Sequence, residues 1–185
     1  MNARGIGIAA ALALSACAGG SKSDGFASDW EQQHARLLEG PVRDATPPIP
    51  ALPRRESLLE FKVEPSKGFR YFIDGRSLSV SDRNVRYTLV ARSPSGVDNT
   101  SFEVIDCKEH QFRSYARASD AGGWIEHPTE WRQIQTPLNA VQSVLQWQYF
   151  CPSGIAVRDA PEAVAALRAG GHPWARPSTG APSGR

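Results

Sequence analysis

The sequence contains few of the patterns that identify a catalytic or nucleic-acid-binding protein. It has no run of Lys and Arg, and its formal net charge of +2 over 185 residues argues against binding to nucleic acid. It has no internal repeat and no stretch of about 20 apolar residues that would predict a membrane-spanning helix. These absences leave a single domain with one hydrophobic core as the expected architecture.

Closely spaced metal ligands are also missing. Zinc ligands usually occur in near pairs, as in HExxH or CxxC, whereas the four histidines are far apart along the chain. They are His34, His110, His127 and His172. Ser95 precedes a glycine but lacks the GxSxG context of a nucleophile elbow. We therefore expect no metal and no cofactor, and no pattern here indicates an enzyme.

The N-terminus has the features of an export signal. Arg4 is followed by the short apolar run Ile6–Leu14, and the sequence Leu14-Ser15-Ala16-Cys17 resembles the lipobox of bacterial lipoproteins. This resemblance implies a signal peptide over residues 1–16 and a lipidated Cys17, whose acyl chains contribute roughly 0.8 kcal/mol per buried CH₂. The alternative is an ordinary secretory signal. Ala18 is not an Asp, and by resemblance to the sorting of Gram-negative lipoproteins this implies an outer-membrane anchor, with the domain expected to face the periplasm.

Residues 17–54 are predicted to form a tether. The stretch after Cys17 is rich in Gly and Ser and should be flexible. Five prolines then favour an extended, semi-rigid segment. They are Pro41, Pro47, Pro48, Pro50 and Pro53. This segment is interpreted either as a spacer, which we favour, or as a ligand for a proline-recognising partner.

Residues 55–170 are predicted to form one α+β domain. Its centre is a three-stranded antiparallel meander over residues 85–117, where two alternating runs flank a Ser-Pro-Ser-Gly turn. The period of two places Tyr87 and Leu89 on one face, and Arg86, Thr88 and Arg92 on the other. Further strands are expected in the LLEFKV, FRYFI, SLSVS and WRQIQ segments, at residues 58–63, 69–73, 77–81 and 131–135.

The pattern then changes to a helical one. A first helix is predicted to start with Thr136 as its cap and Pro137 at its first position, and to run toward Cys151. A second helix is predicted from Asp159, with Glu162 as a capping-box partner. It should end at residues 170–171, and residues 171–185 should form a disordered tail. The predicted fold is thus a small antiparallel sheet with a C-terminal helix packed on it.

The cysteines predict one disulfide bond. With Cys17 carrying lipid, Cys107 and Cys151 remain as an even pair in an exported chain. Closing a loop of about 45 residues stabilises a protein by roughly 4 kcal/mol in the chain-entropy model. A redox-active or metal-binding pair is the rival interpretation, although no CxxC motif is present.

Several of these segments together resemble the cryptic neisserial protein family of bacterial envelope proteins. They are the lipobox, the Pro-rich segment, SLSV, VRYTLVARSPSG, FEVIDC, SYA, Trp124, Trp131 and YFC. The resemblance covers about residues 55–152 and implies a small secreted or lipidated protein of unknown activity, with no site residue to carry over. Val104 departs from the small residue expected at that position, so the resemblance implies different packing of the central strand.

A binding surface is the functional hypothesis that the residues support best. Tyr115, Trp124 and Trp131 would form an aromatic platform for a glycan or peptide, and Arg92 and Arg117 would meet a carboxylate-bearing partner. Alternatively, the tryptophans fill the core and the arginines pair with acidic neighbours across strands. We therefore expect an accessory binding or structural module that contacts an envelope protein or cell-wall component. The alternative is a hydrolase of cell wall or small esters with an unrecognised site.

Overall fold

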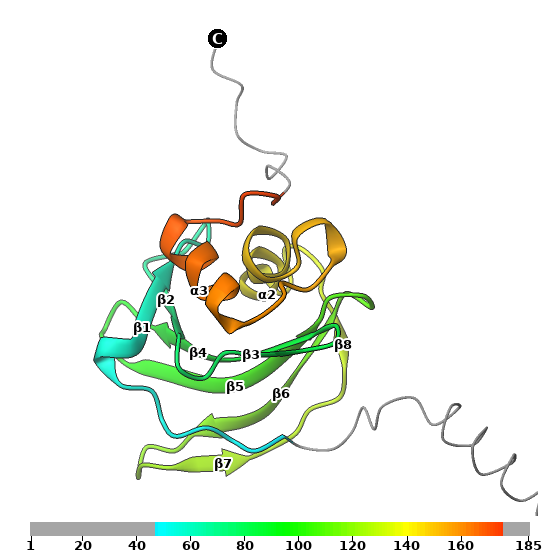
Figure 1. Cartoon of the computed structure of the whole chain (residues 1–185). Coiled ribbons are helices and arrows are strands. Elements are labelled where there is room, and N and C mark those ends of the chain that lie inside the picture. Colours follow the sequence, from blue (N-terminus) through cyan, green and yellow to red (C-terminus); the bar gives the residue numbers. More distant parts are fainter. Residues whose placement is uncertain (1–46, 176–185) are drawn as a thin grey trace, which may run out of the picture. The chain divides into compact units, whose positions relative to one another are not determined.

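The computed structural model describes residues 47–175, and it confirms the predicted α+β fold (Figure 1). An eight-stranded antiparallel sheet carries the helices of the C-terminal part on one face, and one disulfide joins the two layers. We call the face that carries the helices the inner face of the sheet, and the opposite face the outer face. The predicted signal peptide, Cys17, the tether as far as residue 46 and the tail from residue 176 lie outside the described residues.

The sheet has a simple meander at its centre. The strand order is β1-β2-β4-β5-β6-β7, with β3 beside β4 and β8 beside β6. The strands are β1 (Leu58–Phe61), β2 (Arg70–Asp74), β3 (Ser79–Ser81), β4 (Asn84–Arg92), β5 (Asp98–Asp106), β6 (Gln111–Ala118), β7 (Trp124–Glu126) and β8 (Arg132–Gln133). The sequence predicted all of these segments except β7 as extended, because alternating apolar residues mark a half-buried strand. The short strand β7 was not predicted.

The hairpin between β4 and β5 sets the register of the sheet. Ser93 donates its backbone N–H to the Val97 carbonyl at 2.9 Å, and Gly96 takes a φ of +87°. A side chain would be strained there, so glycine suits this turn. The strands then pair from Arg92 opposite Asp98 to Asn84 opposite Asp106.

The main core lies between the inner face and the helices. Val85, Tyr87 and Leu89 of β4 are buried there, as the alternation predicts. From the other layer, Leu145 and Phe150 are fully buried in the same core. The rings of Tyr87 and Phe150 lie 5.3 Å apart and join the two layers directly.

The helical part begins later than predicted. The helical segments are η1 (Arg55–Ser57), α2 (Ala140–Val144), η2 (Leu145–Phe150), η3 (Pro152–Gly154) and α3 (Ala160–Ala169). Thr136 is not the helix cap, because its hydroxyl bonds the Ser143 hydroxyl at 2.7 Å instead of a backbone N–H. A turn precedes the helix, in which the Gln135 N–H donates to the Asn139 side chain at 2.5 Å. The segment η2 continues α2 in the wider π form.

Helix α3 matches its prediction at both ends. The Asp159 carboxylate accepts the Glu162 N–H at 2.9 Å, and Gly170 ends the helix with a left-handed φ of +78°. Glu162 reaches back to the N–H of Arg158 at 2.6 Å, one residue before the cap, so the reciprocal bond of a capping box is shifted by one position.

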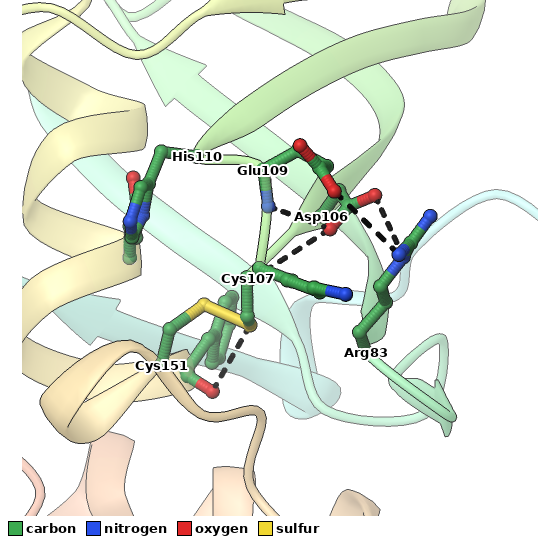
Figure 2. The surroundings of a disulfide bond; sticks show 9 residues. Arg83, Asp106, Cys107, Glu109, His110 and Cys151 are labelled. Carbon is green, nitrogen blue, oxygen red and sulfur yellow. Dashed lines mark hydrogen bonds and ion pairs between the residues drawn. A yellow bond between two sulfur atoms is a disulfide. The ribbon is translucent and has the colours of Figure 1, made fainter.

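The predicted disulfide between Cys107 and Cys151 is present. Cys107 follows β5 and Cys151 follows η2, with their Cα atoms 5.4 Å apart, inside the usual range for a disulfide. Figure 2 shows the neighbouring loop, where Arg83 lies 3.0 Å from Asp106 and the Asp106 carboxylate also accepts the Glu109 N–H at 3.0 Å. The bond therefore fastens the helical layer to an ordered end of the central strand.

Candidate binding surface on the outer face

The outer face carries a second, smaller hydrophobic cluster. Phe102 and Val104 of β5 are buried there with Tyr115 and Ala116 of β6. Ile49, Trp124 and Trp131 pack against these residues from outside the meander. We call Phe102, Tyr115, Trp124 and Trp131 the aromatic cluster. In Figure 1, β7 and the cyan segment near residue 50 cover this face, opposite α2 and α3.

A β-bulge places Tyr115 in this cluster. Phe102 pairs with Ala116 whereas Glu103 pairs with Ser114, so Tyr115 is the extra residue on β6. Its ring lies 5.7 Å from that of Phe102, and only 2% of its surface is exposed. A bulge commonly redirects a side chain, and this one adds an aromatic ring to the outer face.

A buried cation links two members of the aromatic cluster. The guanidinium of Arg113 lies 4.8 Å from the centre of the Tyr115 ring and 5.5 Å from that of Trp131. Arg113 itself is buried, and its flat guanidinium stacks well on aromatic faces. Tyr115 and Arg113 are thus part of the packed layer, while Trp124 and Trp131 remain partly exposed.

The chain's own proline-rich residues lie on the aromatic cluster. Pro50 accepts a hydrogen bond from the Trp124 indole Nε1 at 2.7 Å, and Ile49 packs against the cluster. We call residues 47–54 the proline segment. It falls within the predicted tether, and its contact with the sheet was not predicted.

A hollow of about 250 Å³ opens beside the proline segment. We call it the arginine hollow. Its lining comes from the segment, η1 and the adjoining strands: Leu52, Pro53, Arg55, Leu58, Val90, Arg92, Asp98, Thr100 and Ala118. Its lining therefore combines apolar side chains with two cations and one carboxylate.

Arg92 is held in a fixed orientation at the arginine hollow. Its guanidinium donates to both carboxylate oxygens of Asp98, at 2.6 and 2.8 Å, and lies 5.1 Å from the centre of the Phe72 ring. Hydrogen bonding to Arg92 lowers the pKa of Asp98, and the positive charge of Arg55 acts in the same direction. The hollow therefore presents a rigid, paired guanidinium rather than a freely moving one.

The predicted binding residues are only partly brought together. Tyr115, Trp124 and Trp131 share one cluster on the outer face, and Arg92 lies at the adjoining hollow. Arg117 is exposed. In the strand register it lies opposite Ser101, and Ser101 lies opposite Leu89, whose side chain is in the main core on the inner face. Because directly paired residues share a face of the sheet, Arg117 lies on the opposite face from Arg92.

A buried polar contact on the inner face was not predicted from the sequence. The Glu103 carboxylate accepts hydrogen bonds from Tyr87 at 3.0 Å, Ser101 at 2.6 Å and Gln142 at 3.0 Å. Burial raises the pKa of Tyr87 well above its ordinary value, and the Glu103 charge adds to this rise. These bonds satisfy a carboxylate between the sheet and α2, and they are a structural contact rather than an open site.

The histidines of the described part do not gather into a metal site. His110 hydrogen-bonds Gln146 and its ring packs at a tilt against that of Trp147, with ring centres 5.0 Å apart, while His172 contacts Glu162 at 3.3 Å. Over residues 47–175, no three His, Cys, Asp or Glu side chains are close enough to hold a metal ion. Within the same residues, no helix has the length and apolar character needed to cross a bilayer.

The family assignment rests on a match over residues 39–168, more than two thirds of the chain, to the model of the CNP1-like (cryptic neisserial protein 1-like) family. The chain belongs to this family. No match was found among curated proteins or among solved structures. The matched range of this CNP1-like protein includes the proline segment, the whole sheet and both disulfide cysteines. The resemblance seen in the sequence is therefore confirmed, and it extends further toward both ends than predicted.

Proposed function

We propose that this CNP1-like protein is a lipid-anchored accessory module of the bacterial envelope that binds a carboxylate-bearing envelope component at the arginine hollow. The observation that carries the proposal is the position of Arg92, whose oriented guanidinium lines a hollow large enough for a small group of a ligand. The ligand is an exposed carboxylate of another envelope protein or of the cell wall.

The arrangement of charge explains how such a group would be held. Arg92 and Arg55 carry two positive charges at the hollow, against the single negative charge of Asp98. An incoming carboxylate restores neutrality, and a guanidinium binds a carboxylate by charge-assisted hydrogen bonds. The apolar side chains of Leu52 and Val90 suit the aliphatic part of the same ligand.

The predicted anchor places this surface at the membrane. Acyl chains on Cys17 would hold the domain on the outer membrane, and residues 18–46 would separate it from the lipid surface. The lipobox and the membership in a family named for neisserial proteins support this localisation.

The proposal predicts that Arg92→Gln abolishes capture of the partner from cells. The lipidated, C-terminally tagged chain is crosslinked in intact cells and captured, and bound proteins and glycan fragments are identified by mass spectrometry. Because a neutral amide cannot replace the charge of the guanidinium, the specific adduct should fall by roughly tenfold or more.

Arg70→Gln is the matched control for this experiment. Arg70 also pairs with a carboxylate, Glu60 at 2.6 Å, and also lies over the Phe72 ring, at 5.2 Å, but it does not line the arginine hollow. The Arg70→Gln chain should therefore capture as much as the unchanged chain. Equal capture by both variants, with both folded, would rule out the arginine hollow as the binding site.

A further inference from the structure

The contact between the proline segment and the aromatic cluster has the chemistry of peptide recognition. Extended proline-rich peptides bind to aromatic-lined grooves, because their stiff backbone loses little entropy on docking. Here four prolines occupy residues 47–54, Ile49 packs on the aromatic cluster, and the Pro50 carbonyl accepts the indole N–H of Trp124 at 2.7 Å.

We infer that the aromatic cluster is a binding site for a proline-rich, extended segment of another polypeptide, and that the proline segment is its resident intramolecular ligand. This inference goes beyond the proposed function, because it concerns the surface beneath the proline segment, although Leu52 and Pro53 of that segment also line the arginine hollow. The partner chemistry is that of the resident ligand: prolines, an apolar side chain like Ile49, and a backbone carbonyl facing Trp124.

Proline also explains the mode of attachment. A proline has no backbone N–H, so a segment with prolines at alternate or adjacent positions cannot join the sheet as a regular strand. Its carbonyl groups remain available as acceptors. An indole is a donor only, so Trp124 and the Pro50 carbonyl form a matched pair.

The resident segment fills the site incompletely. The buried Nε1 of Trp131, in the same cluster, has no hydrogen-bond partner among the described residues. A second hollow of about 90 Å³ lies along Pro50, Ala51 and Leu52 and reaches Asp74 on β2. A buried unpaired donor is unfavourable, so a foreign peptide that offers a carbonyl to Trp131 would bind better than the resident one.

The resident segment also sets a threshold for binding. Because it is joined to the domain, it competes at an effective concentration on the order of millimolar. Weak proline-rich ligands are therefore excluded, and only a segment that uses the unfilled contacts displaces it.

The test uses the full mature chain without lipid, with Cys17→Ser, and a fluorescent peptide of residues 45–54, ATPPIPALPR. Ile49→Asp places a charge on the aromatic cluster and should release the resident segment. This variant should bind the peptide at least tenfold more tightly than the unchanged chain, because the intramolecular competitor is gone. Adding Trp124→Phe should weaken that binding roughly fivefold, because one hydrogen bond is lost.

Arg54→Gln is the matched control, since it makes the same change of charge at an exposed residue of the same segment that lines neither hollow. It should bind the peptide as weakly as the unchanged chain. The inference is overturned if folded Ile49→Asp chain fails to bind, or if a peptide with every proline replaced by alanine binds equally well. A dimer of the unchanged chain in light scattering would also overturn it, in favour of a second copy as the occupant.

Backbone NMR relaxation provides a readout that does not depend on the folding of Ile49→Asp. In the otherwise unchanged chain, Trp124→Phe should lower the backbone order parameters of Ile49, Ala51 and Leu52, while those of β4 and β5 stay high. Unaltered order parameters in the proline segment would show that the indole does not hold it, and would contradict the inference.

Discussion

Arg113 shows how a single side chain holds the outer face together. Its guanidinium lies between Tyr115 and Trp131 in a buried position, whereas most arginines of the sheet are at least partly exposed. A desolvated cation over an aromatic ring is worth about 2 kcal/mol, against about 0.5–1 kcal/mol at an exposed site. The outer cluster therefore depends on a charged residue as well as on apolar ones.

We predict that Arg113→Ala lowers the free energy of unfolding by about 2–3 kcal/mol, through lost stacking and lost packing of the side-chain stem. Urea unfolding followed by tryptophan fluorescence measures this change. Arg132→Ala is the control, because Arg132 lies over Phe112 at 4.6 Å but is exposed. Arg132→Ala should lower the free energy of unfolding by less than about 1 kcal/mol. An equal loss of stability in both variants would contradict the assigned role of Arg113.

At the scale of elements, the disulfide is the covalent link between β5 and the helical layer. Both sulfur atoms are buried against a core that already joins the two layers through Tyr87 and Phe150. The loop that the bond closes spans a sequence separation of 44 residues. The disulfide should therefore stabilise the protein mainly by lowering the conformational entropy of the unfolded chain, and only slightly by changing the folded structure.

We predict that Cys107→Ala combined with Cys151→Ala lowers the free energy of unfolding by roughly 4 kcal/mol and leaves the fold intact. Thermal unfolding of the double variant, and of the unchanged chain after reduction, measures the effect. Both should melt at a lower temperature than the oxidised chain. An unchanged melting temperature and gel mobility after reduction would show that the bond does not stabilise this protein.

The elements differ in how well local sequence predicts them. The strands around Tyr87 and the second helix were predictable, because the alternation of apolar and polar residues and the Asp159 cap are local signals. The start of the first helix was not, because Thr136 bonds a side chain seven residues away and leaves the backbone uncapped. The bulge at Tyr115 was not predictable either. It depends on how β6 pairs with β5, and the residue pattern of β6 alone carries no information about that pairing.

For the whole molecule, the main finding is that the proline segment lies against the domain. The sequence correctly indicated an extended, proline-rich stretch and an aromatic set, but it could not indicate that they touch, because 74 residues separate Pro50 from Trp124. It likewise grouped Arg92 with Arg117, which the strand register places on opposite faces. Residues 47–54, which the sequence assigned to the tether, therefore lie on the very face proposed for binding.

Site-specific photo-crosslinking in intact cells shows directly whether the outer face is the recognition surface. A benzophenone amino acid replaces Thr100, which lines the arginine hollow, or Arg168, an exposed residue of α3 on the other side of the sheet. We expect a discrete adduct of the lipidated chain from position 100 and none from position 168. Adducts from position 168 alone, or equal adducts from both, would contradict the account.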